Sequence, residues 1–364
     1  MKNMTQPVVS PPPFTHLETG LAEAVAQLIA EGESAHTTRS YRAALRYWAA
    51  WFAMRFGCSL SLPVAPAVVM QFVVDHVQRR SDQGLQQELP AAIDEELVRS
   101  RFKAKLGPLS LSSLHHRIAV LSQLHRMQSL ANPMDEPAVR QLLAKTRRAY
   151  ATRGVRQDKK PALTRTPLQQ LLATCDDSPR GKRDRALLLF AVASGGRRRA
   201  EVTQACMERL RPVGPAQYVY ILGQSKTDQP ALEDATAFKP LVGSAGAALE
   251  AWLTVSGVSS GAIFRRVRRG GVIAEALNPA AVRRIVMNRA KLAGLEELGY
   301  SAHSLRSGFI TEAGMQNIPM AEAMALSGHA STAVALGYFR AGNVLTSTAA
   351  RLFDTDTAAV PGQK

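Results

Sequence analysis

The amino-acid sequence predicts a mainly α-helical protein of two domains, with a small antiparallel β-sheet in the second. Apolar residues recur three and four positions apart through much of residues 17–150, which is the repeat of helices that bury one face. Residues 164–345 instead mix helical stretches with a β-rich run, Tyr218–Leu222. A basic linker is expected at residues 151–163, and a flexible, proline-punctuated segment at residues 1–16.

Five helices are expected in the first domain. Their apolar patterns place them at residues 17–28, 37–52, 66–80, 110–127 and 136–150. Thr37 or Thr38 can cap the second helix, and Pro66 suits the first turn of the third. Residues 81–108 carry an acidic patch and are expected to form an insertion between helices.

The second domain is expected to hold more and shorter elements. Helical patterns cover residues 168–173, 183–193, 245–255, 279–292, 303–313 and 319–326. Gly314 and Gly328 favour helix ends, and Ser331 or Thr332 can cap one more helix. A last amphipathic piece, residues 346–353, lies within the C-terminal segment 346–364.

The charge balance indicates a polyanionic ligand. Forty-five Lys and Arg residues against 29 Asp and Glu give a net charge of +16 and a pI near 10.3, in a chain of 364 residues. Such an excess on a protein of ordinary hydrophobic content is typical of nucleic-acid binding. Charge alone leaves open a merely basic protein with no such partner.

Cysteines and apolar runs argue against several other classes. Cys58, Cys175 and Cys206 are isolated and odd in number, so neither a disulfide framework nor a zinc site is expected, and a reducing cytoplasm is favoured. The N-terminus has no apolar signal core, and the apolar run at residues 186–193 is too short to span a bilayer. We therefore expect a cytoplasmic protein without a membrane partner.

Four residues late in the second domain carry groups that together can support attack on a phosphodiester. They are His303, Arg306, His329 and Tyr338. On a helix, His303 and Arg306 face the same way and can grip one phosphate. Tyr338 can act as a nucleophile if cations and a base such as His303 help it lose its proton, and His329 can donate a hydrogen bond to a phosphate oxygen. Singly, each has a simpler explanation, since helical tyrosines are usually core residues and polar helix faces are common.

Two upstream positions extend this group. Arg198 precedes Glu201 by three residues, and a carboxylate at that spacing can orient the guanidinium on one helical face. Arg197 and Arg199 then point elsewhere, with phosphates as one destination. Lys226 follows the β-rich run, where a lysine on a hairpin tip can protonate a leaving oxygen. A solvated charge run and an ordinary exposed lysine are the simpler alternatives.

The order and spacing of these residues resemble the signature of the tyrosine recombinase (phage integrase) family. Residues 47–51, 252–258 and 264–268 also resemble segments of its Cre-like site-specific recombinases, and the whole resemblance covers roughly residues 35–355. It implies a two-domain DNA clamp that joins a helical, SAM-like core-binding domain to a catalytic domain. Residues 81–108 have no counterpart that we can place in this pattern.

The resemblance also implies a reaction. The family's catalytic roles fall on Arg198, Lys226, His303, Arg306, His329 and Tyr338, with Glu201 in support. Tyr338 would attack a DNA phosphate to give a 3′-phosphotyrosine, His303 would serve as acid and base, and Lys226 would protonate the leaving 5′ oxygen. The other three would stabilise the phosphorane. No metal, ATP or other cofactor is implied.

The implied partners are double-stranded DNA with inverted-repeat sites and further copies of the chain. Members of the family act as homotetramers on two DNA sites, through a Holliday junction, and residues 346–353 resemble the helix that docks into a neighbouring protomer. A bacterial, phage or plasmid origin and a place at the nucleoid would follow. The candidate DNA-binding residues are Thr38, Arg39, Arg42, Ser112, Ser113, His116, Arg147 and Arg148.

Three functions remain open from the sequence. A site-specific recombinase is favoured, while a type IB topoisomerase or a telomere resolvase uses a similar set of groups. A non-catalytic DNA-binding protein of the same fold is the alternative from a different class. Formation of a covalent protein–DNA adduct would separate the enzymes from this last alternative.

Overall fold

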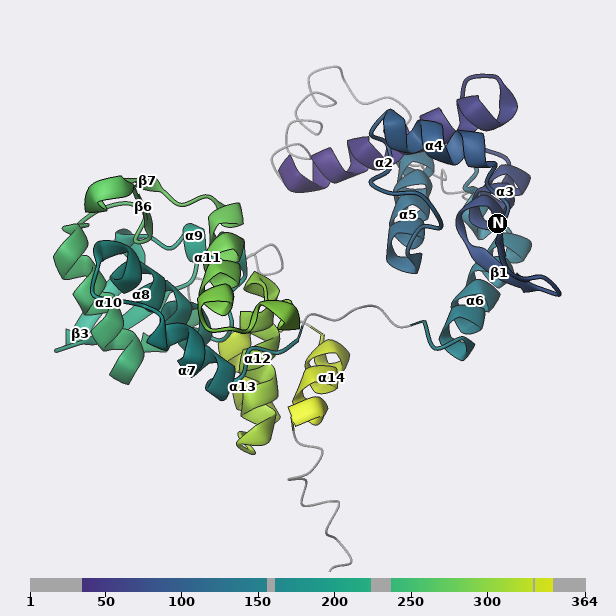
Figure 1. Cartoon of the computed structure of the whole chain (residues 1–364). Helices are drawn as coiled ribbons and strands as arrows, with labels where there is room; N and C mark the ends of the chain where they lie inside the picture. Colours follow the sequence, from purple (N-terminus) through teal and green to yellow (C-terminus); the bar gives the residue numbers. More distant parts are fainter. Residues whose placement is uncertain (1–34, 156–160, 224–236, 330, 343–364) are drawn as a thin grey trace, which may run out of the picture. The chain divides into compact units, whose positions relative to one another are not determined.

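The computed structural model describes residues 35–155, 161–223, 237–329 and 331–342 (Figure 1). The chain divides into two compact units, Met1–Gln157 and Asp158–Lys364, each with its own hydrophobic core. Most described elements are helices and the strands are short and antiparallel, so the predicted fold class is confirmed. None of the helices in these ranges has the length and apolar character that a membrane crossing needs.

The first unit is a group of helices with one short hairpin. Its elements are α2 (Ala35–Phe56), α3 (Pro66–His76), β1 (Gln78–Ser81), β2 (Gly84–Gln87), α4 (Ala91–Arg99), α5 (Leu111–Met127), η1 (Pro133–Asp135) and α6 (Pro137–Thr152). Ser110 caps α5 by accepting a hydrogen bond from the amide of Ser113. The helix expected at residues 17–28 lies outside the described residues.

Aromatic rings fill the core of this unit. Trp48 stacks on Phe72 with ring centroids 3.7 Å apart, and Trp51 meets the same ring edge-on at 4.9 Å. His76 is fully buried beside them, where its Nδ1 lies 2.7 Å from the carbonyl oxygen of Phe72 and its Nε2 2.7 Å from the hydroxyl of Tyr47. A carbonyl can only accept, so Nδ1 carries the proton and Nε2 accepts from Tyr47.

Three expectations for this unit are corrected. Helix α2 begins at Ala35, so Thr37 and Thr38 lie inside it and neither is its cap. Helix α3 ends at His76 because residues 78–81 pair with residues 84–87 in an antiparallel hairpin. Residues 81–108 are no appended insertion, since they contain α4, whose Leu97 is fully buried in the core.

The second unit surrounds a small sheet with helices. Its elements are α7 (Arg165–Ala173), α8 (Pro179–Ala193), α9 (Arg199–Thr203), η2 (Met207–Arg209), β3 (Leu210–Gly214), β4 (Gln217–Ile221), β5 (Phe238–Leu241), α10 (Gly243–Ser256), β6 (Arg265–Val267), η4 (Arg269–Gly271), β7 (Ile273–Ala276), α11 (Pro279–Leu292), η5 (Glu296–Leu298), α12 (Ala302–Met315), α13 (Met320–Ser327) and α14 (Thr332–Gly342). The helices expected here are present with shifted ends, whereas residues 346–353 lie outside the described part.

Strands β3, β4 and β5 form one antiparallel sheet in that order, and β6 pairs with β7 in a second. Buried Phe190 of α8 packs edge-on against Tyr220 of β4 and against Phe264. The contact with Tyr220 joins α8 to the sheet. Asp184 of α8 is also buried and accepts hydrogen bonds from Arg183 and Arg289. Its two ionic partners satisfy the carboxylate inside the core.

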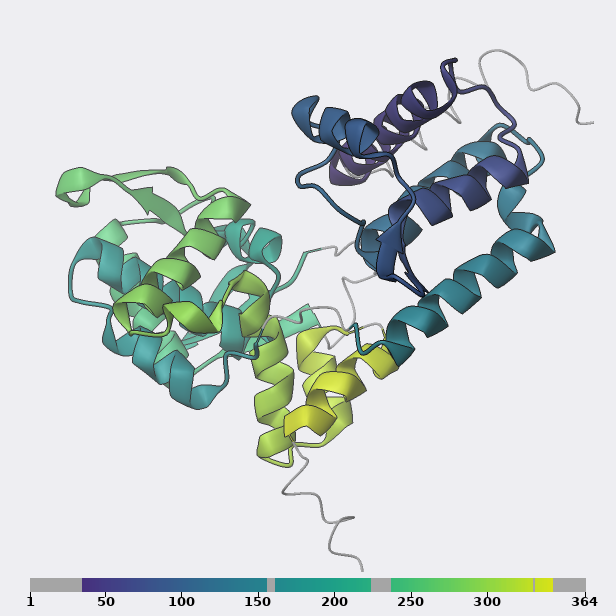
Figure 2. The ribbon, with the colours of Figure 1, turned by 45° about the vertical axis from the view of Figure 1, so that its right-hand side comes forward.

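The last helices form a satellite of this unit. Helix α14 lies beside α12, as Figures 1 and 2 both show. Ile310 and Ala313 of α12 and Ala323 of α13 are buried there, with Tyr338 and Phe339 of α14 packed against them. Gly314 marks the closest approach, because a Cβ at this position would lie 2.2 Å from the carbonyl oxygen of Phe339. Only a glycine lets the two backbones come this close.

Candidate active site

A cavity of about 370 Å³ opens at the start of α12 in the second unit. The start of α9, the exposed side of α11 and the first turn of α12 supply its walls. Its lining residues are Arg198, Arg199, Arg283, Ser301, Ala302, His303 and Arg306. The structure therefore brings Arg198, His303 and Arg306 to one place, although Arg198 lies far from the other two in the sequence.

Arg306 is buried and firmly held. Its Nη1 donates to the carbonyl oxygens of Gly196 at 3.2 Å and Ser327 at 2.8 Å, and its Nη2 donates to that of Gly328 at 3.3 Å. Burial, and then the charges of nearby arginines, lower the pKa of Arg306 to about 10. The guanidinium thus stays positive at neutral pH, in a fixed position and without a carboxylate partner among its described contacts.

The Gly195–Gly196 turn makes this arrangement possible. Gly196 has a φ of +74°, and a Cβ on it would lie 2.7 Å from the Cα of Arg306. Gly195 has a φ of +97°, and its Cβ would lie 2.2 Å from the carbonyl oxygen of Leu326. Both positions need glycine for conformation and for space, so the turn seats tightly against α12 and the end of α13.

The consecutive arginines at the start of α9 have different environments. The side chain of Arg197 is 4% exposed, and its Nη2 donates to the carbonyl oxygen of Leu326 at 2.8 Å. Arg198 is the N-cap residue of α9 with a side chain 52% exposed, and its Nη1 donates to Glu201 at 2.8 Å. Of these two, Arg198 is the one that a DNA phosphate can reach.

Glu201 orients Arg198 differently from the predicted way. Arg198 does not lie on a helical face, because the helix begins after it at Arg199. Instead, Glu201 reaches back and accepts both the backbone amide of Arg198 at 3.0 Å and its guanidinium. Burial alone would raise the pKa of Glu201, but the bonds from Arg198 and the charge of Arg197 lower it overall. The carboxylate is thus an anion that holds Arg198 in place.

The two histidines are poised to be neutral. Loss of solvent around its ring, then Arg306 and Arg198, lower the pKa of His303 below its ordinary value of 6.5. The same causes lower the pKa of half-buried His329 to about 4. The Nδ1 of His329 lies 2.7 Å from the hydroxyl of buried Ser327. His329 follows Gly328, the C-cap residue of α13, which has a φ of +62°. A neutral imidazole can accept a proton or donate one hydrogen bond at pH 7.

Tyr338 lies on the neighbouring helix and does not line the cavity. Its side chain is half-buried, and its carbonyl oxygen accepts from the hydroxyl of Thr311 on α12 at 3.4 Å. The residue therefore packs on a small core, and its helix lies against the one that carries His303 and Arg306. Lys226 lies outside the described residues.

Among the residues that line the cavity, sequence reasoning missed Arg283, Ser301 and Ala302, and it linked Arg199 only loosely with phosphates. Arg283 on α11 and Ser301 before α12 carry no motif. Sequence reasoning also missed Lys239 of β5, whose buried Nζ donates to the carbonyl oxygen of Ala325 and ties the sheet to α13. No motif in the sequence marks Arg283 or Lys239, because the fold alone brings each of them to its contacts.

The candidate DNA-binding residues of the first unit fall into two groups. Thr38, Arg39 and Arg42 are near the start of α2, and Ser112, Ser113 and His116 are in the first turns of α5. A hydrogen bond of 2.9 Å between Ser40 and His116 joins the two helix faces. All but Ser113 are exposed, so these six residues form one polar surface.

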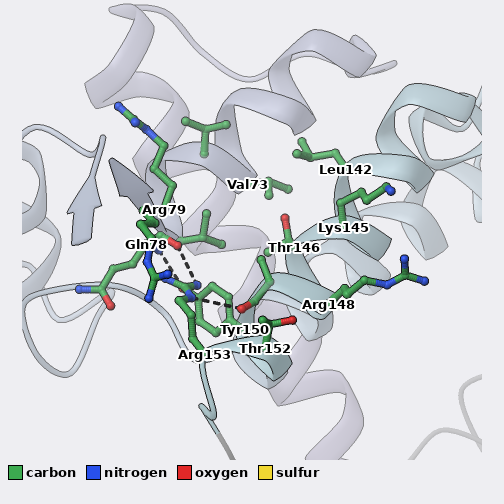
Figure 3. A pocket seen from close by; sticks show the side chains of 14 residues that line it. Val73, Gln78, Arg79, Leu142, Lys145, Thr146, Arg148, Tyr150, Thr152 and Arg153 are labelled. Carbon is green, nitrogen blue, oxygen red and sulfur yellow. Dashed lines mark hydrogen bonds between the residues drawn. The ribbon is translucent and has the colours of Figure 1, made fainter. Parts of the chain in front are cut away.

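Arg147 and Arg148 lie elsewhere, in α6, where the sequence predicted a helix. Arg148 lines a groove of about 640 Å³ between α3 and α6, shown in Figure 3. The groove includes Val73 and Leu142 beside basic residues such as Lys145. Its lining is mainly apolar, so Arg148 is placed at a different kind of surface from the α2–α5 group.

Comparison with known proteins gives one consistent result. Residues 161–343 match the model described as "Phage integrase family". The chain is 22% identical over 340 residues to "Recombinase cre" of Escherichia phage P1, covering 88% of both chains. It is 29% identical over 247 residues to "Integrase/recombinase xerD homolog" of Selenomonas ruminantium, covering 65% of this chain and 71% of the relative.

A solved structure supports the same fold along most of the chain. A fragment of the Tn1549 transposon integrase, in complex with circular intermediate DNA, aligns with a TM-score of 0.51 at 12% identity. The alignment covers 89% of this chain and 97% of that chain. At this identity the likeness concerns the fold of both units and not the chemistry.

Proposed function

We propose, because the chain belongs to the phage integrase family of tyrosine recombinases, that Tyr338 is the nucleophile of a site-specific DNA recombination reaction. Its phenolic oxygen would bond to the scissile phosphorus as the bond to the 5′ oxygen breaks. The products are a 3′-phosphotyrosine and a 5′ hydroxyl. The observation that carries the proposal is the shared cavity of Arg198, His303 and Arg306 at the start of α12, the helix against which α14 with Tyr338 packs.

The cavity residues would stabilise the charge that develops on the phosphate. The side chain of Arg306 is held in one orientation, because its guanidinium donates hydrogen bonds to three backbone carbonyls. Arg198 lines the same cavity from the N-cap position of α9. His329, which follows the end of α13, would add a neutral donor. Preorganised donors of this kind are worth most where charge appears only in the transition state.

His303 and Lys226 would transfer the protons of the reaction. His303 has a lowered pKa, is neutral at pH 7 and can take the proton of Tyr338. Lys226 would give a proton to the leaving 5′ oxygen. The phosphotyrosine keeps the energy of the broken bond, so rejoining needs neither ATP nor a metal in this scheme.

Exchange between two DNA sites requires more than one active site. We infer four copies of the chain on two duplexes with inverted-repeat sites, with strands cleaved in pairs through a Holliday junction. The exposed α2–α5 surface, with Arg39, Arg42 and His116, would contact the bases and backbone of each site. Arg147 and Arg148 would add phosphate contacts on α6.

A nicked suicide substrate tests the chemistry, because loss of a short strand traps the covalent intermediate. We expect an adduct with the wild-type chain and none with Tyr338→Phe, which should still bind DNA. An adduct that persists in this variant would refute the assignment. Relaxation of supercoiled circles without exchange between sites would instead indicate a topoisomerase.

The choice of arginine has its own test. Arg198→Ala should slow adduct formation by about 10² to 10³, the usual effect of one lost preorganised donor, with little change in thermal stability. Arg197→Ala should lower stability, since that side chain holds the end of α13. Normal cleavage by Arg198→Ala would show that another arginine binds the phosphate.

A further inference from the structure

Two arginines in the candidate active site have no role in the reaction above. Arg199 and Arg283 both line the cavity and both are exposed. Arg199 is the first residue of α9, directly after Arg198, and Arg283 lies in the first turns of α11. The two helices thus place an additional guanidinium each at the mouth of the same cavity.

Neither guanidinium has an ionic partner within the described part of the chain. Arg266 and Arg268, two other exposed arginines of this unit, both pair with Glu275. Glu201 is the carboxylate that contacts Arg198 at this cavity, and its ionic partners among the described residues are Arg197 and Arg198. The cavity therefore carries more positive charge than its carboxylate balances, which favours an anionic ligand.

The start of α12 adds backbone donors at the same place. Ser301 is the N-cap residue of this 14-residue helix, and Ala302 and His303 are its first two residues. The capping box of Ser301 and Ser304 uses the amides of those two residues, so the amides of Ala302 and His303 are the ones left without an acceptor within the helix. The helix dipole favours an anion at this end. Ser301, Ala302 and His303 line the cavity together with Arg283, so charge and backbone donors converge.

The cavity is also large for a single phosphate. A volume of about 370 Å³ equals roughly twelve waters at about 30 Å³ each. A phosphate group has five heavy atoms, so space remains after one group sits between Arg198 and Arg306. In a DNA strand the next phosphate is one nucleotide away. Any DNA bound with its scissile phosphate in the cavity therefore brings a second phosphate close by.

We propose that Arg199 and Arg283, with the start of α12, form a second phosphate site that binds the phosphodiester adjacent to the scissile one. The inference rests on the proposed function, because it assumes that the scissile phosphate lies at Arg198 and Arg306. The second site sets the register of the strand, so that the correct phosphorus meets the nucleophile. Arg199 and Arg283 are positioning residues in this scheme.

Single methylphosphonate substitutions test the contact, since each removes the charge of one chosen phosphate. On unmodified DNA, Arg283→Ala should reduce the single-turnover rate of adduct formation about tenfold, the lower range for a bond to a charged group. On DNA that is neutral at the contacted neighbouring phosphate, the same variant should lose nothing further. Arg199→Ala should show this non-additivity at the same phosphate, and Arg283→Lys should give a smaller loss on unmodified DNA.

Arg284→Ala is the matched control, because it removes an equally exposed charge from the next position of α11, outside the cavity lining. Its effects should add to those of every methylphosphonate. Strictly additive losses for Arg283→Ala at both neighbouring phosphates would overturn the second site. If the wild-type chain forms no Tyr338 adduct on unmodified DNA, the proposed function fails and this inference with it; normal adducts with additive losses reject the second site alone.

Discussion

Replacement of Gly314 by alanine should slow DNA cleavage without abolishing DNA binding. The added Cβ would lie 2.2 Å from the carbonyl oxygen of Phe339, whereas ordinary contact begins at 3.4 Å. The difference, 3.4 − 2.2, means that α12 and α14 must separate by about 1.2 Å at this point. Tyr338 precedes Phe339 on α14, while His303 and Arg306 are on α12. The substitution therefore moves the proposed nucleophile away from the residues that hold the phosphate.

The size of the effect follows from that displacement. A misplacement of about 1 Å at a reacting group can cost on the order of 10² in rate. Overpacking should also lower the free energy of unfolding by roughly 1–3 kcal/mol, which leaves a folded protein if the unit has ordinary stability. We expect adduct formation on a suicide substrate to slow about a hundredfold under single-turnover conditions, while the Kd for the same DNA changes little.

Gly337→Ala provides a control on α14 itself. This glycine is next to Tyr338, yet a Cβ there would meet no heavy atom within 4 Å. Because alanine favours a helix over glycine by about 1 kcal/mol, the variant should be as stable as wild type or more so, with a normal cleavage rate. Equal cleavage by the two variants would refute the claim that the α12–α14 contact positions the nucleophile.

Two further predictions concern stability. Burial lowers the pKa of His76 from 6.5 to about 3, so the unfolded chain takes up this proton first and the first unit should lose roughly 1.4 kcal/mol per pH unit as the pH falls from 6.5 toward 3. Over this range the urea midpoint of wild type should fall relative to that of His76→Gln, and parallel curves would contradict the prediction. Asp184→Asn leaves Arg183 and Arg289 buried without their anion and should cost roughly 3–5 kcal/mol in urea unfolding, whereas Glu275→Gln, which breaks only exposed ion pairs, should cost less than about 1 kcal/mol.

Local signals in the sequence identified most of the helices but few of the strands. Helices such as residues 279–292 show their apolar repeat over several turns, so the pattern alone locates them. Strands β1 and β6 have four and three residues, too few for a pattern. Their existence depends on a partner strand across a turn, which a short run does not reveal. Thr37 and Thr38 were misassigned because a capping residue type does not by itself begin a helix.

The site was predictable to the extent that its residues form local motifs. His303 and Arg306 are three residues apart on one helix, so their common direction followed from helical geometry. The spacing to Glu201 favoured Arg198 over Arg197, although both side chains are within reach of that carboxylate. Burial separates them, and burial depends on α13, more than a hundred residues later. Arg283 joins the cavity for the same reason and left no trace in the sequence.

The end of α13 explains how a cluster of cations is stable before DNA arrives. The last carbonyls of a helix lack partners and carry partial negative charge. Here the carbonyl of Leu326 is bound by Arg197 and those of Ser327 and Gly328 by Arg306. These guanidinium groups therefore cap a helix while they form the site, and the helix end offsets part of their repulsion. His329 follows that end directly, so the same bonds that stabilise the cations also fix the imidazole beside them.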